Sequence, residues 1–452
     1  MTHDRARAVT RVAAIGAIAS LLLFQPTARG QTGDEPLTLE GAISIALAGS
    51  RHIEIATLEV AKAEERLTAT KTHRYPVLDL DVMASKLLSP IEMGFERGVF
   101  GDFPGIGPIP DEDTQVTSES NIDWFVTASV AQPLTQQREI GLGVEAAQMD
   151  VEVRRERLRL ARQEVASQVR QAYDAVLQAQ SARDAAVEAS AYLTELERVV
   201  AGHVERETAL TSDLLDVRAR LLGSGYQQRV AEHSAQTAKE QLNLLLGRDV
   251  TTPFTAQQEP APPDLETNLE AAVAKALESR PDVREARLLA RTADLDLSRK
   301  RAEYIPDLSF VISNYSLNVD FLPRNIQTVG LNLSWEPFDW GRKRHEAAEK
   351  LLTRSQSERS AAETEAAARV EVGSLFRALD ESRALIEVRE AERTAAKEKA
   401  RVLANRYEQQ AALLKDVLQA QSDVAQTEDR YRQSVLAYWT TRAGFLKAVG
   451  EE

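Results

Sequence analysis

Residues 39–53 read LEGAISIALAGSRHI, and residues 269–283 read LEAAVAKALESRPDV, so one stretch of sequence recurs at an offset of 230. Further along, Pro133 corresponds to Pro337 at an offset of 204, and Asp213-Leu-Leu corresponds to Asp416-Val-Leu at an offset of 203. The first copy therefore carries one long insertion before Pro133. A repeat of about 200 residues is too long for a solenoid unit. We expect a duplicated domain whose two halves surround an axis or a pore.

The composition excludes several classes of function. The chain has 452 residues, a formal net charge of -14, 5% aromatic residues and no cysteine. Disulfides, thiolate chemistry and an acylated N-terminal cysteine are therefore excluded. The acidic balance argues against nucleic acid as a partner. Few aromatic residues and many charged ones favour long helices with narrow apolar seams.

Residues 1–30 are predicted to be a secretory signal peptide. Arg5, Arg7 and Arg11 form a basic start, and an apolar run of 13 residues extends over 12–24. Ala28-Arg29-Gly30 has small residues at the cleavage positions, which predicts a mature chain that starts at Gln31. A membrane anchor is the alternative, but such a run is too short to cross about 30 Å of hydrocarbon.

Each half is predicted to contain a helix, two strands, a long helix and a shorter helix. Residues that alternate between apolar and polar indicate the strands, and heptad spacing such as Val165, Val169, Ala172 and Val176 indicates the long helices. A single helical stretch is expected at about 38–73, ended by Pro76. The seam of the first shorter helix is expected to include Leu214, Leu221 and Leu222. The first repeat is predicted to span 31–247, with strands at about 77–88 and 122–134, a long helix at about 138–202 and a shorter helix at about 212–246. A proline-rich linker follows at 248–268. The second repeat is predicted to span 269–452, with strands at about 307–318 and 327–337, a long helix at about 341–410 and a shorter helix at about 415–448.

The predicted strands have one apolar and one polar face. Two hairpins packed on a soluble core would explain this pattern, and so would strands in a membrane. Four strands cannot close a membrane barrel, because the smallest have about eight, and an open edge leaves backbone groups unpaired in lipid. Strands that cross a membrane therefore require several chains. The expected lipid-facing residues are Leu78, Leu80, Trp124, Val126, Leu331, Leu333 and Trp335, and the expected lumen-facing residues are Asp79, Asp81, Thr127 and Asn332.

Several motifs in duplicated order resemble the outer-membrane efflux protein (TolC-type) family. They are the leucine- and alanine-rich openings at 37–47 and 269–277, the strand-to-helix turn Pro337-Phe338-Asp339-Trp340-Gly341-Arg342, the Asp-Leu/Val-Leu motif at each helix reversal, and the closing run from Tyr431 to Gly450. The resemblance covers residues 37–450. It implies a mainly α fold with a small membrane β-barrel, in which a homotrimer forms a 12-stranded barrel that continues into an α-helical coiled-coil tunnel.

The same resemblance implies a function and its partners. The chain would be the outer-membrane channel of a tripartite efflux or type I secretion system in a Gram-negative-type bacterium, with a large periplasmic portion. It would be a passive exit duct, without enzymatic activity or cofactor. It would dock to a periplasmic adaptor (membrane fusion) protein and an inner-membrane transporter. A periplasmic coiled-coil adaptor and a soluble structural protein are the alternatives, although an adaptor normally has one helical hairpin and this chain has two.

The resemblance also implies a periplasmic gate at the helix reversals near 203–213 and 406–416. Asp416 would form an acidic ring in the trimer, and Tyr407 would bond to Asp213. Three carboxylates around a narrow axis repel one another and attract cations. The simpler alternative is that Asp213 and Asp416 cap the returning helices. The residues expected to contact the adaptor are Glu207, Thr208, Leu210, Gln410, Ala411 and Leu413.

The sequence departs from the family pattern at these reversals. Glu207 and Gln410 stand where the family has a glycine, and Leu210 and Leu413 stand where it has a serine. Ala412 replaces a basic gate residue, and Gln419 replaces a second lumenal aspartate. We therefore predict a weaker gate.

The remaining motifs are given no catalytic role. The six histidines are scattered, and His203-x-Glu205-x-Glu207 does not share one helix face, so a solvated surface is expected there. The insertion at about 86–121 contains Phe95, Phe100 and Phe103. It is expected to be an extracellular loop that either constricts the mouth of the channel or is disordered.

Overall fold

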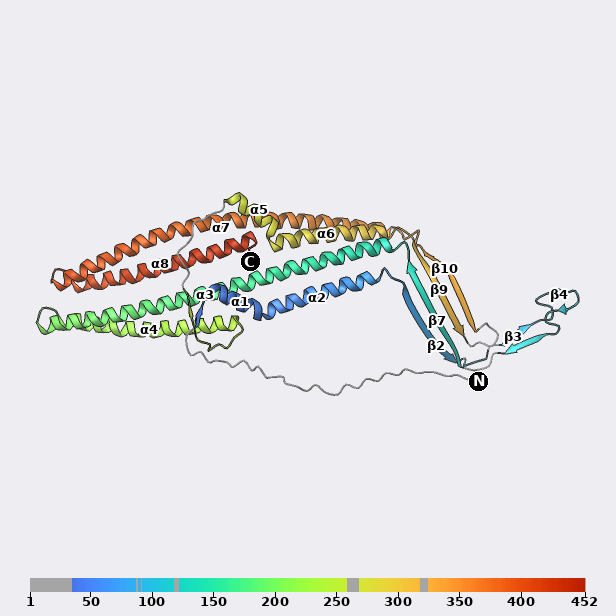
Figure 1. Cartoon of the computed structure of the whole chain (residues 1–452), viewed down its shortest axis with the longest axis horizontal. Helices are drawn as coiled ribbons and strands as arrows, with labels where there is room; N and C mark the ends of the chain where they lie inside the picture. The colour runs from blue at the N-terminus through green and yellow to red at the C-terminus, as the bar shows by residue number, and fades with distance from the viewer. Residues whose placement is uncertain are drawn as a thin grey trace, which may run out of the picture.

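The computed structural model describes residues 35–86, 88–90, 92–117, 122–257, 268–317 and 324–451. The predicted signal peptide lies outside these residues. Long helices run side by side as a rod, and a β-sheet continues the rod at one end (Figure 1). The helices are α1 (Leu39–Gly49), α2 (Arg51–Thr72), α3 (Gln137–Glu205), α4 (Thr211–Leu245), α5 (Leu269–Ser279), α6 (Pro281–Ala302), α7 (Arg342–Glu408) and α8 (Leu414–Val449). The strands are β1 (Glu35–Leu37), β2 (Val77–Lys86), β3 (Glu92–Phe95), β4 (Asp102–Phe103), β5 (Gly107–Pro108), β6 (Thr114–Thr117), β7 (Ile122–Pro133), β8 (Phe254–Ala256), β9 (Asp307–Leu317) and β10 (Asn325–Ser334).

Two long helices organise the rod. Helix α3 has 69 residues and α7 has 67, so each is about 100 Å long. Away from the sheet the helices pack in the order α4, α3, α8, α7, and nearer the sheet the order is α2, α3, α6, α7 (Figure 1). The chain therefore contributes four helices at both levels. Its lateral edges are α7 on one side and α4 or α2 on the other.

Helix α4 corrects one detail of the predicted seams. Val217 and Leu242 are completely buried where α4 packs on α3, whereas Leu222 is 77% exposed. Leu221 and Leu222 are neighbours in sequence, so they point about 100° apart on a helix. The prediction is therefore wrong for Leu222 in the seam that α4 forms with α3 within one chain.

The helix expected at about 38–73 is two helices. Ser50 separates α1 from α2 with an extended backbone (φ -74°, ψ 119°), and Arg280 separates α5 from α6 in the same way (φ -62°, ψ 128°). Pro281 explains the second break, since a proline favours an extended residue before it and a helix start at its own position. In the first copy the break follows Gly49, a poor helix former. Both repeats therefore keep the same bend.

The four long strands form one antiparallel sheet in the order β10-β9-β7-β2. The hairpin of each repeat joins the other through β7 and β9, where Val126 lies opposite Ser316. Within each hairpin, Leu80 lies opposite Ala128, and Leu331 lies opposite Phe310. Among the described residues, β2 and β10 each pair on one side only. The sheet is therefore open at both edges.

A small parallel sheet ties the segment after α4 to the start of the chain. Strand β8 pairs with β1, so residues 254–256 lie beside 35–37. Phe254 is 1% exposed and belongs to the same core as Val169 and Tyr173 of α3. The Tyr173 hydroxyl donates to the carbonyl of Leu37 at 2.7 Å. The described part of the predicted linker is thus packed into the first repeat.

Candidate gate at the helix reversals

Both helix reversals have the same backbone structure, at the end of the rod remote from the sheet (Figure 1). In the first, Thr208 N–H donates to the carbonyl of His203 (2.9 Å), and Glu207 N–H donates to that of Val204 (3.0 Å). In the second, Ala411 N–H donates to Arg406 (2.8 Å), and Gln410 N–H donates to Tyr407 (2.9 Å). This pair of bonds is a Schellman motif, which satisfies the last carbonyls of a helix.

A Schellman motif needs a left-handed residue just after the helix, and here that residue is not glycine. Glu207 has φ 58° and Gln410 has φ 59°. These are the positions where glycine was expected from the family pattern. An L-residue with a side chain costs roughly 1–2 kcal/mol in this conformation. Both tips therefore carry a local strain that glycine would remove.

Asp213 and Asp416 stand at equivalent places in the first turn of α4 and α8. Asp213 N–H donates to the carbonyl of Leu210, and Asp416 N–H donates to that of Leu413, both at 3.0 Å. The Asp213 carboxylate also accepts from Leu210 N–H at 3.4 Å. A negative charge in the first turn favours the helix dipole. The capping role therefore has direct support for Asp213, and the lumenal role of Asp416 stays a prediction.

Tyr407 lies where the two helical hairpins meet. It packs against an apolar cluster drawn from the other three helices, α3, α4 and α8, whose buried members are Leu196, Val200, Val217, Leu414 and Leu418. Its ring contacts that of His203 edge-on, with centroids 5.7 Å apart. His203 is half-buried, whereas Glu205 and Glu207 beside it are exposed to solvent. The ring contact was not predicted, because it joins residues that are about 200 positions apart.

Tyr407 and Asp213 are close enough to influence each other. Burial raises the pKa of the Tyr407 hydroxyl, and the negative charge of Asp213 raises that pKa further. Among the residues that the structure describes, no hydrogen bond joins the two side chains. The predicted bond therefore stays a proposal.

Polar bonds between the two hairpins lie well away from the tips. Arg432 on α8 donates to the carbonyl and hydroxyl of Ser181 on α3, at 2.9 and 2.7 Å. The Thr440 hydroxyl donates to Asp174 at 2.9 Å. Within the described segments 184–231 and 384–431, no hydrogen bond or ion pair crosses from one hairpin to the other. Near the reversals, apolar contacts and the ring contact of His203 with Tyr407 hold the hairpins together.

The second hairpin retains a carboxylate near the position that Gln419 occupies. Gln419 donates to Asp423 at 2.9 Å, and Lys399 on α7 donates to the same carboxylate at 3.0 Å. These two hydrogen bonds lower the pKa of Asp423, with Gln419 contributing most. The charge of Asp423 is thus paired within its own hairpin.

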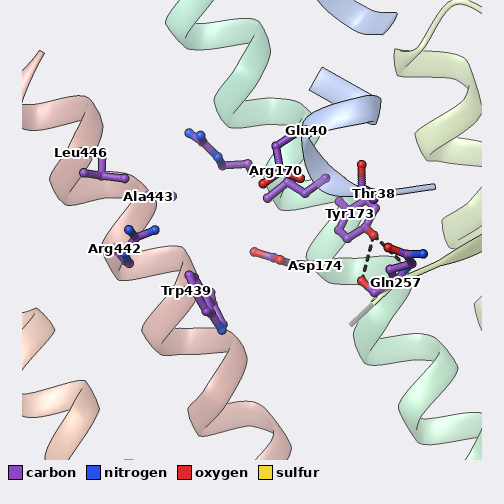
Figure 2. Close-up of a pocket in the computed structure, with 11 residues that line it drawn as sticks. Thr38, Glu40, Arg170, Tyr173, Asp174, Gln257, Trp439, Arg442, Ala443 and Leu446 are labelled. Atoms are coloured by element: carbon purple, nitrogen blue, oxygen red, sulfur yellow. Dashed lines mark hydrogen bonds between the residues drawn. The ribbon is translucent and has the colours of Figure 1, made fainter. Parts of the chain in front are cut away.

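A cavity of about 320 Å³ separates α8 from α1 and α3 where the two repeats meet (Figure 2). Asp174 faces α8 across this space, and burial is the main cause that raises the pKa of its carboxyl. The Arg442 guanidinium lies 5.3 Å from the ring centre of Trp439. Sequence reasoning missed this contact region between the repeats, because its residues come from four distant segments. The lining residues are Thr38, Leu39, Glu40, Arg170, Tyr173, Asp174, Gln257, Trp439, Arg442, Ala443 and Leu446.

The sheet register sorts the strand residues into two faces. Because residues directly opposite each other in antiparallel strands share a face, Leu78, Leu80, Trp124, Val126, Leu331 and Leu333 all lie on one face. Asp79, Asp81, Thr127 and Asn332 lie on the other. Trp335 follows the end of β10 and is 59% exposed. Both faces are accessible in the single chain, so register rather than burial distinguishes them.

The described residues offer little for other chemistry. No group of three or more His, Asp or Glu side chains among them is arranged to hold a metal ion. None of the described helices combines the length and the apolar character needed to cross a membrane.

Comparisons with known proteins give one family and one fold. The family model described as "Outer membrane efflux protein" matches residues 42–248 and 272–451. The CusC channel is 17% identical, with 92% of each chain covered and a TM-score of 0.77. CmeC of Campylobacter jejuni is 16% identical over 91% of this chain and 85% of its own, with a TM-score of 0.74. VceC of Vibrio cholerae is 15% identical over 91% and 96%, with a TM-score of 0.74. No curated protein sequence matches the chain.

Proposed function

The chain belongs to the outer membrane efflux protein family, and from this premise we propose that three copies of it form one passive exit duct. The protein is a TolC-type outer-membrane channel of tripartite efflux. Channels of this family are trimeric and work with adaptors and inner-membrane transporters. The trimeric barrel of this particular chain, its gate and its partners are the proposed part.

The open four-stranded sheet is the observation that carries this proposal. One face presents Leu78, Leu80, Val329, Leu331 and Leu333, each more than 60% exposed. The strands are 10 to 12 residues long, enough to cross the hydrocarbon of a bilayer. In lipid the unpaired edges of β2 and β10 would cost several kcal/mol per group. Three copies give twelve strands and pair every edge.

The lateral edges of the helical rod support the same stoichiometry. On α4, apolar side chains lie on the face turned away from α3, and on α7 they lie on the face turned away from α8. Each edge would bury its apolar stripe against the other edge of a neighbouring copy, as in a coiled coil. The exposed residues are Leu215, Leu222, Tyr226, Val230 and Leu244 on α4, and Leu352, Val370, Leu385 and Val388 on α7.

Aromatic residues mark the proposed membrane boundary nearest the helices. Trp335, Phe338 and Trp340 are 59, 69 and 88% exposed at the turn from β10 into α7. The rings of Phe338 and Trp340 meet edge-on at 4.7 Å. Aromatic side chains of this kind gather at the interfaces of membrane barrels. We therefore assign the apolar face to lipid and the face with Asp79 and Asp81 to the lumen.

The helix reversals are assigned to the periplasmic entrance. In this proposal Asp416 lines the entrance, Tyr407 and Asp213 restrict its opening, and residues 207–210 and 410–413 contact the adaptor. The gate is weak because apolar contacts and the ring contact of His203 with Tyr407 join the hairpins there. An inner-membrane transporter would deliver the cargo.

Fractionation and reconstitution test this function together. The full chain, expressed in a Gram-negative host, is expected in the outer membrane and to need detergent for extraction. The purified protein should then form ion-conducting channels in planar bilayers. Recovery in the soluble periplasmic fraction, without channel activity, would instead favour the adaptor or the soluble structural protein.

A further inference from the structure

The long insertion of the first repeat is a folded ribbon rather than a simple loop. Strand β3 pairs with β6, and β4 pairs with β5 (Figure 1). Phe100 N–H donates to the carbonyl of Ile109, and Ile109 N–H donates to that of Gly101, both at 2.9 Å. Gly98 and Gly101 have φ of 72° and 114°, which favour glycine. Backbone hydrogen bonds therefore hold the described part of the ribbon together.

Charge and apolar surface are separated along this ribbon. Among residues 98–110, which we call the ribbon tip, Asp102 alone is charged. Phe100 is 60% exposed, Phe103 45% and Ile106 77%. The flanking segments are acidic, with Glu96, Asp111, Glu112 and Asp113. Exposed apolar side chains that come together on an ordered element often mark a contact surface.

Lipid is a poor partner for the ribbon tip. The tip lies beyond the ends of β2 and β7, on the side away from the helices (Figure 1). Strands β2 and β7, with 10 and 12 residues, already span the hydrocarbon. The acidic flanking segments would also be repelled by the anionic surface of a membrane.

A second copy of the same chain is the partner that the geometry favours. The insertion follows directly from β2, an edge strand, so each ribbon starts at the seam between two subunits. A 12-stranded barrel with a strand spacing of about 4.8 Å and a tilt of about 40° has a radius of roughly 12 Å. Residues 92–103 can extend up to about 40 Å. Three ribbon tips on one rim can therefore meet over the axis.

We propose that the three ribbon tips of a trimer associate through Phe100, Phe103 and Ile106 and close the extracellular mouth of the duct. This inference rests on the proposed trimeric barrel. The shared rim holds the tips at a high effective concentration, so a modest apolar contact suffices. The acidic flanking residues adjoin the tips, so the apolar contact has to outweigh their mutual repulsion.

Cysteine cross-linking tests the contact, and the chain contains no native cysteine to interfere. The variant Ile106→Cys, oxidised as a detergent-purified trimer, should run mainly as a covalent dimer on a non-reducing gel. Lys86→Cys, at the end of β2, is the matched control. Its three copies should remain about 20 Å apart on the rim and stay uncross-linked. If Ile106→Cys stays monomeric on the gel although the protein is trimeric and conducts ions, the tip contact is disproved while the duct stands.

Single-channel conductance tests whether the ribbon tips close the mouth of the duct. Replacing Phe100, Phe103 and Ile106 together by serine should raise single-channel conductance by about twofold or more, because an apolar constriction dewets. Replacing Gln115 and Thr117 of β6 by serine should leave it unchanged. Equal conductance of the tip variant and the wild type would refute the closure. If the wild-type protein itself does not form a trimer, the proposed function would be refuted instead.

Discussion

Glu207 and Gln410 have a left-handed backbone that favours glycine, with φ of 58° and 59°. Replacing each by glycine should stabilise the isolated protein by about 0.5–1 kcal/mol, because the left-handed strain is removed and part of the gain is offset by chain entropy. Thermal unfolding measures this as a raised Tm. The matched control is Glu205→Gly, at the last residue of α3, which should lower the Tm. A lowered Tm for both tip variants would mean that these side chains make stabilising contacts instead.

Substitutions of Tyr407 and Asp213 test the proposed gate, which lies at the same end of the molecule as Glu207 and Gln410. Tyr407→Phe removes the hydroxyl, and Asp213→Ala removes the neighbouring charge, so both should raise single-channel conductance. Asp216→Ala is the control, since Asp216 is an exposed acid on the same helix and forms an ion pair with Arg220 at 3.5 Å. Unchanged conductance in both gate variants would leave Asp213 as a helix cap and Tyr407 as a packing residue.

Asp174, at the contact between the two repeats, makes the stability of the fold depend on pH. Its pKa is raised in the folded state, mainly by burial, so the folded protein holds the proton more tightly than the unfolded chain. The ionised carboxylate therefore destabilises the fold above its raised pKa, and the penalty vanishes as the pH falls below about 3.8. Asp174→Asn should raise the Tm at pH 7, and the gain should shrink towards pH 4. The exposed Asp380→Asn should change the Tm little at either pH.

At the scale of elements, substitutions on the lateral edge of α4 are expected to prevent assembly of the trimer without disturbing the fold of the chain. Leu222→Glu and Tyr226→Glu place charges on exposed side chains that, in our proposal, a neighbouring α7 covers. The trimer should be lost, as measured by light scattering in detergent, while the helical circular dichroism is retained. Gln227→Glu, on another face of α4, is the control. A stable trimer of the double variant would exclude this edge from the interface.

The elements also show what the sequence can and cannot predict. Period-two alternation predicted which residues share each face of the sheet, because a strand has one geometry and the pattern extends over about ten residues. The pairing of β8 with β1 was not predictable, since each strand has three residues and they lie far apart in the sequence. For the seam within one chain, Leu222 was assigned to the wrong face because adjacent leucines fit either side of a helical seam.

The candidate gate was predictable only in part. Duplication revealed the equivalence of Asp213 and Asp416, and the structure gives both the same position in the first turn of a helix. The contact of His203 with Tyr407 left no pattern in the sequence, because it depends on how two hairpins pack. The sequence showed that Glu207 and Gln410 replace glycines, but only the backbone dihedral angles revealed the strain there.

For the whole molecule, the account depends on short strands from several identical chains completing one cylinder in the membrane. Family membership and the fold agree with such a shared barrel. The unpaired edges of β2 and β10 would need strands from neighbouring chains if the sheet lies in lipid. Native mass spectrometry of the mature protein, released from detergent, tests it most directly. We predict a particle with the mass of three chains. A monomer that dissolves in water without detergent and does not bind bilayers would contradict the account.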